Sequence, residues 1–144
     1  MAFRGHFEHS LDAKNRLSIP ARFREAFSDG TVLAKDPETC VAIWPSPTHE
    51  AIIERALSGL NPLGREYRKV ARFYQGNSFD ADLDSAGRVT LPPRLLAHAG
   101  IAKEVVVVGV GDHLEVWDRT RWDSEQPALD AEIEEVTERL GNPS

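Results

Sequence analysis

Cysteine is almost absent from this sequence, with Cys40 as its single representative among 144 residues. One cysteine cannot form an intrachain disulfide, and it cannot supply the several thiolate ligands of a zinc ribbon. Because Cys40 lies in an apolar segment, we expect a small buried side chain rather than a nucleophile. The sequence also lacks a run of about 18 apolar residues, the length that a membrane-spanning helix needs. Its start, MAFRGHFEHS, has no apolar region of the kind found in secretory signals. These absences predict a cytoplasmic protein without membrane contact.

The sequence patterns of enzymes and metal sites are missing as well. No nucleophile elbow, Walker loop or dinucleotide-binding glycine pattern occurs, so we predict no enzymatic activity, no cofactor and no small-molecule substrate. The aspartates within residues 80–84 imitate the start of an EF-hand loop, but Ser85 and Leu91 stand where that loop needs glycine and glutamate. His6 and His9 would point to opposite faces of an alternating strand. We therefore predict no metal site.

Positive charge is scarce overall, because 17 Lys and Arg residues face 23 Asp and Glu residues and leave a net charge of −6. The excess is confined to residues 123–144, which hold seven acids and one base, so the rest of the chain is neutral. Within the neutral part, residues 12–24 and 65–72 each carry a net charge of +3. Such patches on a neutral body are compatible with phosphate binding, although solvated helix faces are their more common meaning.

What the sequence does contain is an internal repeat. An offset of 72 residues aligns DAKNRLSIPARFR (12–24) with DSAGRVTLPPRLL (84–96). With one residue inserted, CVAIW (40–44) aligns with HLEVW (113–117), and we expect the matched Trp44 and Trp117 to anchor the core. A unit of about 40 residues is too small to bury a sufficient core alone. The two units should therefore pack on each other as pseudo-symmetric halves of one β-rich body.

Hydrophobic periodicity predicts the same order of elements in both units, namely strand, turn, strand, helix, strand, strand. Proline ends the second strand and opens the helix, and glycine ends the helix. In the first unit we expect strands at 7–11, 16–20, 31–34 and 40–44 and a helix from Pro20 to Gly30; in the second, strands at 79–83, 88–92, 104–108 and 113–117 and a helix from Pro92 to Gly100. Two further helices are expected at 46–57 and 65–76, and a carboxyl-terminal helix at 120–140 should be interrupted near Pro127.

The sharpest functional signal is the pair Arg16 and Arg88, each at the start of a strand just beyond a tight turn. The tight turn fixes the backbone from which each guanidinium projects. The guanidinium can then bind a phosphate or the O6/N7 edge of guanine through two hydrogen bonds. Asp12 and Asp84 lie four positions earlier and could fix the turn, brace the arginine, or do both. The alternative is an Asp–Arg pair that only locks a hairpin.

Three stretches of the sequence resemble a known protein family. The opening FRGHFEHSLDAKNRLSIPARFR, the second DSAGR copy and the stretch GIAKEVVVVGVGDHLEVWD resemble MraZ proteins over roughly residues 3–122. The resemblance implies a bacterial transcriptional regulator with two SpoVT-AbrB-type domains and an α+β fold. In that fold, swapped-hairpin β-α-β units form a pseudo-symmetric, β-barrel-like body with added helices after each repeat. It also implies a ring-shaped homo-oligomer, associated with the nucleoid. Its partner would be double-stranded DNA with short G-rich direct repeats, upstream of the division and cell-wall gene cluster.

The family's DNA-contacting motif falls on residues 12–16 and 84–88. Two departures are visible: Asn15 stands where the family typically has glycine, and Ala86 replaces the lysine of the first copy. Asn tolerates the left-handed conformation better than most residues, so the turn should survive. We expect the DNA-binding residues to be Asp12, Lys14, Asn15, Arg16, Arg22, Asp84, Gly87, Arg88 and Arg94.

The expected organisation is a first domain at 5–47, a helical linker at 48–75, a second domain at 76–120 and an acidic helix or tail at 121–144. Two other functions stay open at this stage. The acidic tail and the linker helices suggest an AbrB-like protein-binding or assembly module without direct DNA readout. The cluster at residues 80–84 suggests a metal-dependent hydrolase. Ring size, operator sequence and the choice between activation and repression cannot be derived from the sequence.

Overall fold

The computed structural model describes residues 2–141, which form two antiparallel sheets and five helical segments. The strands are β1 (His6–Ser10), β2 (Arg16–Ser18), β3 (Thr31–Lys35), β4 (Val41–Pro45), β5 (Ser78–Ala81), β6 (Arg88–Thr90), β7 (Glu104–Gly109) and β8 (Leu114–Asp118). The helical segments are the 3-10 helix η1 (Ala21–Phe27) and the α-helices α1 (Ser46–Ser58), α2 (Arg65–Gly76), α3 (Pro93–Ala99) and α4 (Arg119–Gly141). The predicted α+β class is confirmed, with a 3-10 helix in place of the first repeat's expected α-helix.

The larger sheet joins the two repeats strand by strand. Its order is β1-β7-β8-β4-β3-β5, so the first strand of each repeat pairs with the third strand of the other, and β4 pairs with β8 in the middle. The second strands of the repeats, β2 and β6, form a separate two-stranded ladder. This order is symmetric about the β4–β8 pair, as an internal duplication predicts. Residues 2–141 form no closed barrel.

The core is shared by both repeats because strand alternation turns one face of each strand inward. Leu17 and Val89, at the centre of the β2–β6 ladder, are almost completely buried. Phe3 adds an aromatic cluster, with its ring edge-on to Phe23 at 5.2 Å between ring centroids and stacked on Phe27 at 5.5 Å. The two repeats thus share one core, which a unit of this size is too small to bury alone.

Two other sequence expectations concern the matched tryptophans. Trp117 is a buried core residue, as expected. Trp44 is only half-buried, and its ring stacks on His113 with the centroids 3.9 Å apart. The prediction that Trp44 anchors the core is wrong, because Ile43 turns into the core and the next residue of the strand, Trp44, lies on the opposite face of β4, beside His49 of α1.

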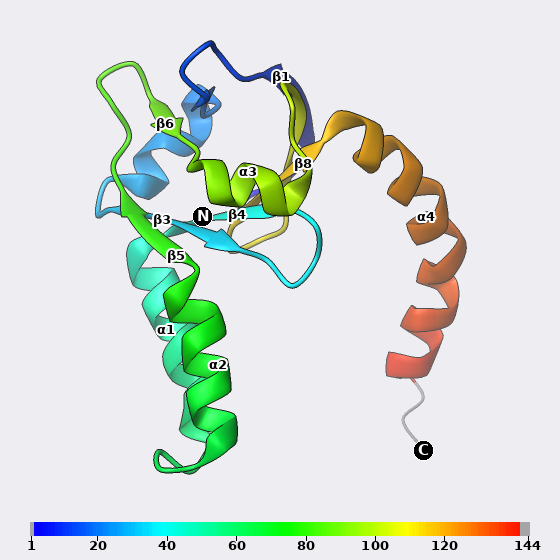
Figure 1. The fold of residues 1–144 in the computed structure, drawn as a ribbon. Helices are drawn as coiled ribbons and strands as arrows, with labels where there is room; N and C mark the ends of the chain where they lie inside the picture. Colours follow the sequence, from blue (N-terminus) through cyan, green and yellow to red (C-terminus); the bar gives the residue numbers. More distant parts are fainter. Residues whose placement is uncertain (1, 142–144) are drawn as a thin grey trace.

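The expected interruption of the last helix is also wrong. Helix α4 runs through Pro127 as one element to Gly141, while the predicted fraying falls partly on residues 142–144, which lie outside the described residues. Proline removes one backbone hydrogen bond and crowds the preceding turn. Figure 1 shows the axis of α4 curving along its course, so the helix is bent but not interrupted.

Helices α1 and α2 pack side by side as an arm that leaves the body on one side, whereas α4 leaves it on the other (Figure 1). None of the helices formed by residues 2–141 has the length and apolar character that crossing a membrane requires. Strand β6 of the β2–β6 ladder lies at the end of the body away from the α1–α2 arm (Figure 1).

Candidate nucleic-acid interface

The first turn is organised by the carboxylate of Asp12. Its Oδ1 accepts hydrogen bonds from the backbone N–H groups of Lys14 and Arg16, both at 2.9 Å, and its Oδ2 accepts one from Arg16 Nε at 2.7 Å. The backbone closes the same turn, because the N–H of Asn15 donates to the Asp12 carbonyl at 3.0 Å. Asn15 adopts a positive φ of 57°, as the sequence predicted for this turn.

The second turn repeats this geometry atom for atom. Asp84 Oδ1 accepts from the backbone N–H groups of Ala86 and Arg88, and Oδ2 accepts from Arg88 Nε, all at 2.9 Å. Gly87 takes the left-handed position with a φ of 76°. The aspartate of each copy therefore fixes the turn and braces the arginine together, which the sequence had left as alternatives.

These hydrogen bonds hold both carboxyls in their ionised form. The pKa of Asp12 is lowered chiefly by the backbone N–H of Arg16, and that of Asp84 chiefly by the backbone N–H of Arg88. The neighbouring guanidinium adds to the effect in each copy. Each arginine is thus paired with a permanent negative charge at neutral pH, and its orientation is fixed at one end.

The β2–β6 ladder brings the two turns into one ribbon. Arg16 lies opposite Thr90, and Arg88 lies opposite Ser18, while Leu17 and Val89 point into the core. By alternation, both arginines project from the outer face, as diagonal neighbours. Backbone bonds of 2.9 Å from Ile19 to Gly87 and from Leu91 to Asn15 extend the ladder to both turns. Exchange between repeats therefore places two copies of the motif on one surface.

The far ends of both guanidinium groups are available to a ligand. Among the contacts of residues 2–141, each group has a protein partner at Nε alone, which leaves the two terminal nitrogens of Arg16 and of Arg88 unbonded. Their side chains are 26% and 34% exposed, so they are held against the ribbon but open to solvent. The two terminal nitrogens are the pair that binds two acceptors at once.

The other expected site residues lie in different settings. Lys14 and Asn15 are exposed in the first turn, next to Arg16. Arg22 is exposed as well, but its guanidinium lies over the rings of Phe7 and Phe23, each at 4.7 Å. It also donates a hydrogen bond to the carbonyl of Arg4. Arg94 is exposed in the first turn of α3, where it has no hydrogen bond or ion pair within the described chain. The structure thus brings Lys14 and Asn15 to the ribbon but engages Arg22 in packing.

Arg24 belongs to this surface and was not among the expected site residues. Its Nε donates to the carbonyl of Ile19 at 2.9 Å, and its side chain lies against Gly87 in the turn of the other repeat. The second turn has Ala86 where the first has Lys14, so Arg24 brings a positive charge to the copy that lacks the lysine. The 3-10 helix η1 lies beside that turn because strands of the two repeats pair with each other. No local sequence pattern could indicate this proximity.

Potential metal ligands gather at another place. Within residues 2–141, Asp36, Cys40 and Glu115 have candidate ligand atoms within 4.8 Å of one another. Cys40 is completely buried, as expected, and burial together with nearby carboxylates raises the pKa of its thiol. A protonated thiol is a poor metal ligand. The aspartates of residues 80–84 form no such group within the described residues.

Fold and site together define a class: a duplicated α+β protein that displays two Asp-braced arginines on one β-ribbon. The model of the MraZ family, described as "MraZ protein, putative antitoxin-like", matches residues 2–66 and 76–141. The chain belongs to the MraZ family, which confirms the resemblance drawn from its motifs.

Three relatives show how far this similarity extends, and each is named "Transcriptional regulator MraZ". The protein of Nitrosospira multiformis is 40% identical over 124 aligned positions, which cover 83% of this chain and 84% of the relative. That of Thiobacillus denitrificans is 39% identical over 147 positions, covering 94% and 99%. That of Desulforamulus reducens is 34% identical over 139 positions, covering 96% of each. The similarity thus includes both repeats and most of the segments that follow them.

Proposed function

We propose that this protein is a sequence-specific, DNA-binding transcriptional regulator that binds short G-rich promoter repeats as a ring-like homo-oligomer. The observation that carries the proposal is the β2–β6 ribbon, whose outer face presents Arg16 and Arg88 with their terminal nitrogens free. The names of the relatives support a role in transcription. In this proposal the protein binds DNA in the bacterial cytoplasm, in association with the nucleoid, and carries out no catalysis.

The dimensions of the ribbon suit the major groove of DNA. A groove about 12 Å wide admits a two-stranded β-ribbon. Arg16 and Arg88 are two residue positions apart along the ladder, which corresponds to about 7 Å at the usual rise of a strand and so to about two base-pair steps. Each guanidinium can bind the O6 and N7 atoms of one guanine, which accounts for a preference for G-rich repeats.

Other residues near the ribbon would bind the phosphate backbone. Lys14 in the first turn and Arg24 beside the second bring one positive charge each to the ribbon, within a body whose total charge is zero. A single ribbon neutralises few phosphates, so its affinity for one repeat is low. An oligomer that holds several ribbons against several repeats raises the overall affinity through effective concentration. The proposal thus reconciles DNA binding with a net charge of −6.

The finer assignment of the fold belongs to the same proposal. Pairing of β1 with β7 and of β5 with β3 supports two units of the AbrB-like swapped-hairpin type. We divide the chain into domains at 5–47 and 76–120, a helical linker at 48–75 and an acidic carboxyl-terminal segment at 121–144. The DNA-binding residues are those predicted from the sequence, with Arg24 added and with Arg22 acting mainly in packing.

The test is a gel-shift titration with a promoter fragment that carries G-rich direct repeats, repeated at several salt concentrations. Replacing Arg16 and Arg88 together by alanine should lower the affinity by about tenfold or more and reduce the salt dependence. Unchanged affinity and unchanged salt dependence would show that the ribbon is not the DNA-binding site. Arg55→Ala removes one positive charge from α1 and serves as the remote control for a single Arg16→Ala variant.

A matched pair of variants separates base reading from charge. Arg16→Lys with Arg88→Lys keeps both positive charges but loses the planar fork that binds two acceptors. This variant should retain most of the salt dependence while its discrimination between the repeats and an unrelated sequence falls by about tenfold. Discrimination equal to that of the unaltered protein would assign both arginines to the phosphates alone.

A further inference from the structure

Helix α4 carries an apolar stripe that extends away from the body. Leu129, Ile133 and Leu140 are 52%, 50% and 78% exposed, and the partly exposed Val136 lies between the last two. The intervals of four, three and four residues place all four side chains on one helix face. Exposed side chains at this spacing mark a helix that packs against another helix.

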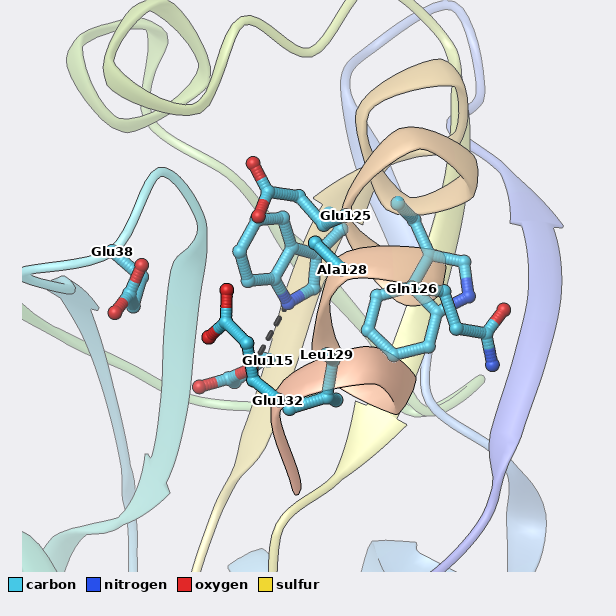
Figure 2. Close-up of a pocket in the computed structure, with 9 residues that line it drawn as sticks. Glu38, Glu115, Glu125, Gln126, Ala128, Leu129 and Glu132 are labelled. Carbon is cyan, nitrogen blue, oxygen red and sulfur yellow. Dashed lines mark hydrogen bonds between the residues drawn. The ribbon is translucent and has the colours of Figure 1, made fainter. Parts of the chain in front are cut away.

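The inner end of the stripe opens into an acidic cavity beside the body. The ring of Trp122 lies 6.1 Å from that of Trp117, measured between centroids, and fastens the start of α4 to β8. Beyond this contact, a cavity of about 340 Å³ contains Leu129 in its lining. Figure 2 shows its carboxylates arriving from the β3–β4 turn, from β8 and from α4. They belong to Glu38, Glu115, Glu125 and Glu132. No basic side chain of the described residues lines this cavity.

Two of these glutamates flank the apolar stripe on its own helix. Glu125 and Glu132 lie seven residues apart and therefore on the same side of α4. Glu115 from β8 is held by the indole N–H of Trp117, which donates to it at 2.9 Å, and burial raises the pKa of this carboxyl. The surface that α4 offers is therefore apolar along its centre and negative along its edge and inner end.

The charge of this surface excludes one obvious partner and favours another. A second α4 would bring seven acids and one base of residues 123–144 against an identical set, and like charges across an interface are unfavourable. Helix α2 has the opposite charge. Arg65, Arg68, Lys69 and Arg72 recur at helical spacing on its exposed side. Leu63, just before α2, is 87% exposed and gives the same region an apolar end.

One chain cannot join these two surfaces to each other. The α1–α2 arm and α4 stand on opposite sides of the body, well separated in Figure 1. We infer that the apolar stripe of α4 and the acidic cavity at its base receive the basic face of α2 from a second copy of this chain. The inference deepens the oligomer of the proposed function by naming its contact, and it does not depend on DNA binding. Because the two surfaces differ, the contact is head-to-tail, and such contacts form rings when the rotation between copies closes.

The experiment measures the molar mass of the full-length protein by light scattering on a size-exclusion column, without DNA. Ile133→Glu places a charge in the stripe, Glu125→Lys with Glu132→Lys reverses the edge of α4, and Arg68→Glu with Lys69→Glu reverses the face of α2. Each of the three variants should weaken self-association by about tenfold or more. All the altered side chains are on helix surfaces, and circular dichroism checks that each variant folds. A control variant, Glu134→Lys with Glu135→Lys, changes the charge by the same amount on the other side of α4 and should keep the original mass.

Recombination of the variants tests the direction of the contact. A mixture of the α4 reversal and the α2 reversal contains two complementary pairs of surfaces, the unaltered α4 with the unaltered α2 and the reversed α4 with the reversed α2. The mixture should therefore form alternating assemblies larger than either variant forms alone. Combining all four reversals in one chain should restore the original mass. Full-size assemblies from the Ile133→Glu variant, or a mixture that stays monomeric, would overturn the inference.

The outcome is independent of the DNA-binding proposal. If Arg16→Ala with Arg88→Ala abolishes DNA binding at unchanged mass, the ribbon binds DNA whatever contact builds the oligomer. If the α4 and α2 variants keep their mass while the arginine variants fail to bind, only the interface inference is wrong.

Discussion

Arg16 and Arg88 are each held at Nε and free at their two terminal nitrogens among the contacts of the described residues. The aspartate takes up Nε together with two backbone N–H groups, so the side chain has lost much of its rotational freedom before any DNA arrives. Ordering a long side chain on binding normally costs about 0.5–1.5 kcal/mol. In the proposed DNA complex a braced arginine avoids part of that cost, so the paired aspartate favours binding although its own charge is negative.

Gly87 should be the least replaceable residue of the second turn. Its positive φ of 76° is strained for any residue with a Cβ, by about 1–2 kcal/mol, and the added atom would collide with the Arg24 side chain. Gly87→Ala should therefore lower the free energy of unfolding, as measured by urea denaturation. In an Arg24→Ala background the loss should be smaller, because only the backbone strain persists. Equal losses in both backgrounds would show that Arg24 does not press on this turn. Asn15→Gly is the matched control in the first turn, and it should leave the free energy of unfolding nearly unchanged.

Acid should weaken both turns through the two aspartates. Their pKa values are lowered from the ordinary 3.8, so the stability that they contribute is fully present above the pKa of the unfolded chain and is lost as the pH falls through the lower pKa of the folded protein. An Asp12→Asn, Asp84→Asn variant should therefore be less stable than the unaltered protein at neutral pH. The difference between their urea midpoints should narrow only as the pH falls below about 4. A difference that stays constant down to strongly acidic pH would contradict this account.

For individual residues, the sequence predicted the contacts within one turn but not those between the repeats. Asp12 and Arg16 lie four residues apart in one turn, so their pairing could be expected, as could the left-handed conformation of Asn15. The contact of Arg24 with the second turn could not, because it joins residues of different repeats through strand pairing. The engagement of Arg22 with two phenylalanine rings escaped prediction for the same reason.

Among the elements, the strands and the bounds of the last helix were predicted well, but the interruption of that helix near Pro127 was predicted wrongly. Alternation located every strand to within a few residues, since one buried face imposes a period of two. Helix α4 has no buried residue, so its sequence reflects solvent and partners more than the core. Local sequence rules predict that proline interrupts such a helix. The structure shows that the helix continues through Pro127 and is bent.

Replacing that proline should strengthen α4 without strengthening the body. Pro127→Ala restores an N–H that can bond the carbonyl of Asp123, and proline in a helix interior costs about 3 kcal/mol relative to alanine. We expect slower hydrogen exchange over residues 123–141, while the thermal midpoint of the body stays nearly constant. Ala131→Gly should speed up exchange over the same residues, because glycine in a helix interior lowers the stability of the helix by about 1 kcal/mol relative to alanine. Unchanged exchange in the Pro127→Ala variant would mean that the proline does not weaken the helix.

At the scale of the whole molecule, charge is sorted by position. The duplicated body is neutral and carries the ribbon, whereas residues 123–144 hold the entire excess of −6. The duplication and this sorting could both be derived from the sequence. The exchange of strands that puts two turns on one ribbon could not be derived from spacing, since strands of one repeat could equally have paired among themselves. It entered the prediction only through the family resemblance.

This sorting predicts how α4 affects DNA binding at a distance. Glu134 and Glu135 lie away from the apolar stripe, and replacing both by glutamine changes the net charge from −6 to −4. Weaker long-range repulsion should increase affinity for repeat-bearing and unrelated DNA alike at low salt. The gain should shrink near physiological salt, where the Debye length is about 8 Å. Gel-shift titrations at two salt concentrations measure both effects. Because α4 does not form part of the ribbon, the ratio of the two affinities should stay constant. A change in that ratio would place α4 in contact with the bases, and a gain that persists at high salt would place it against the phosphates.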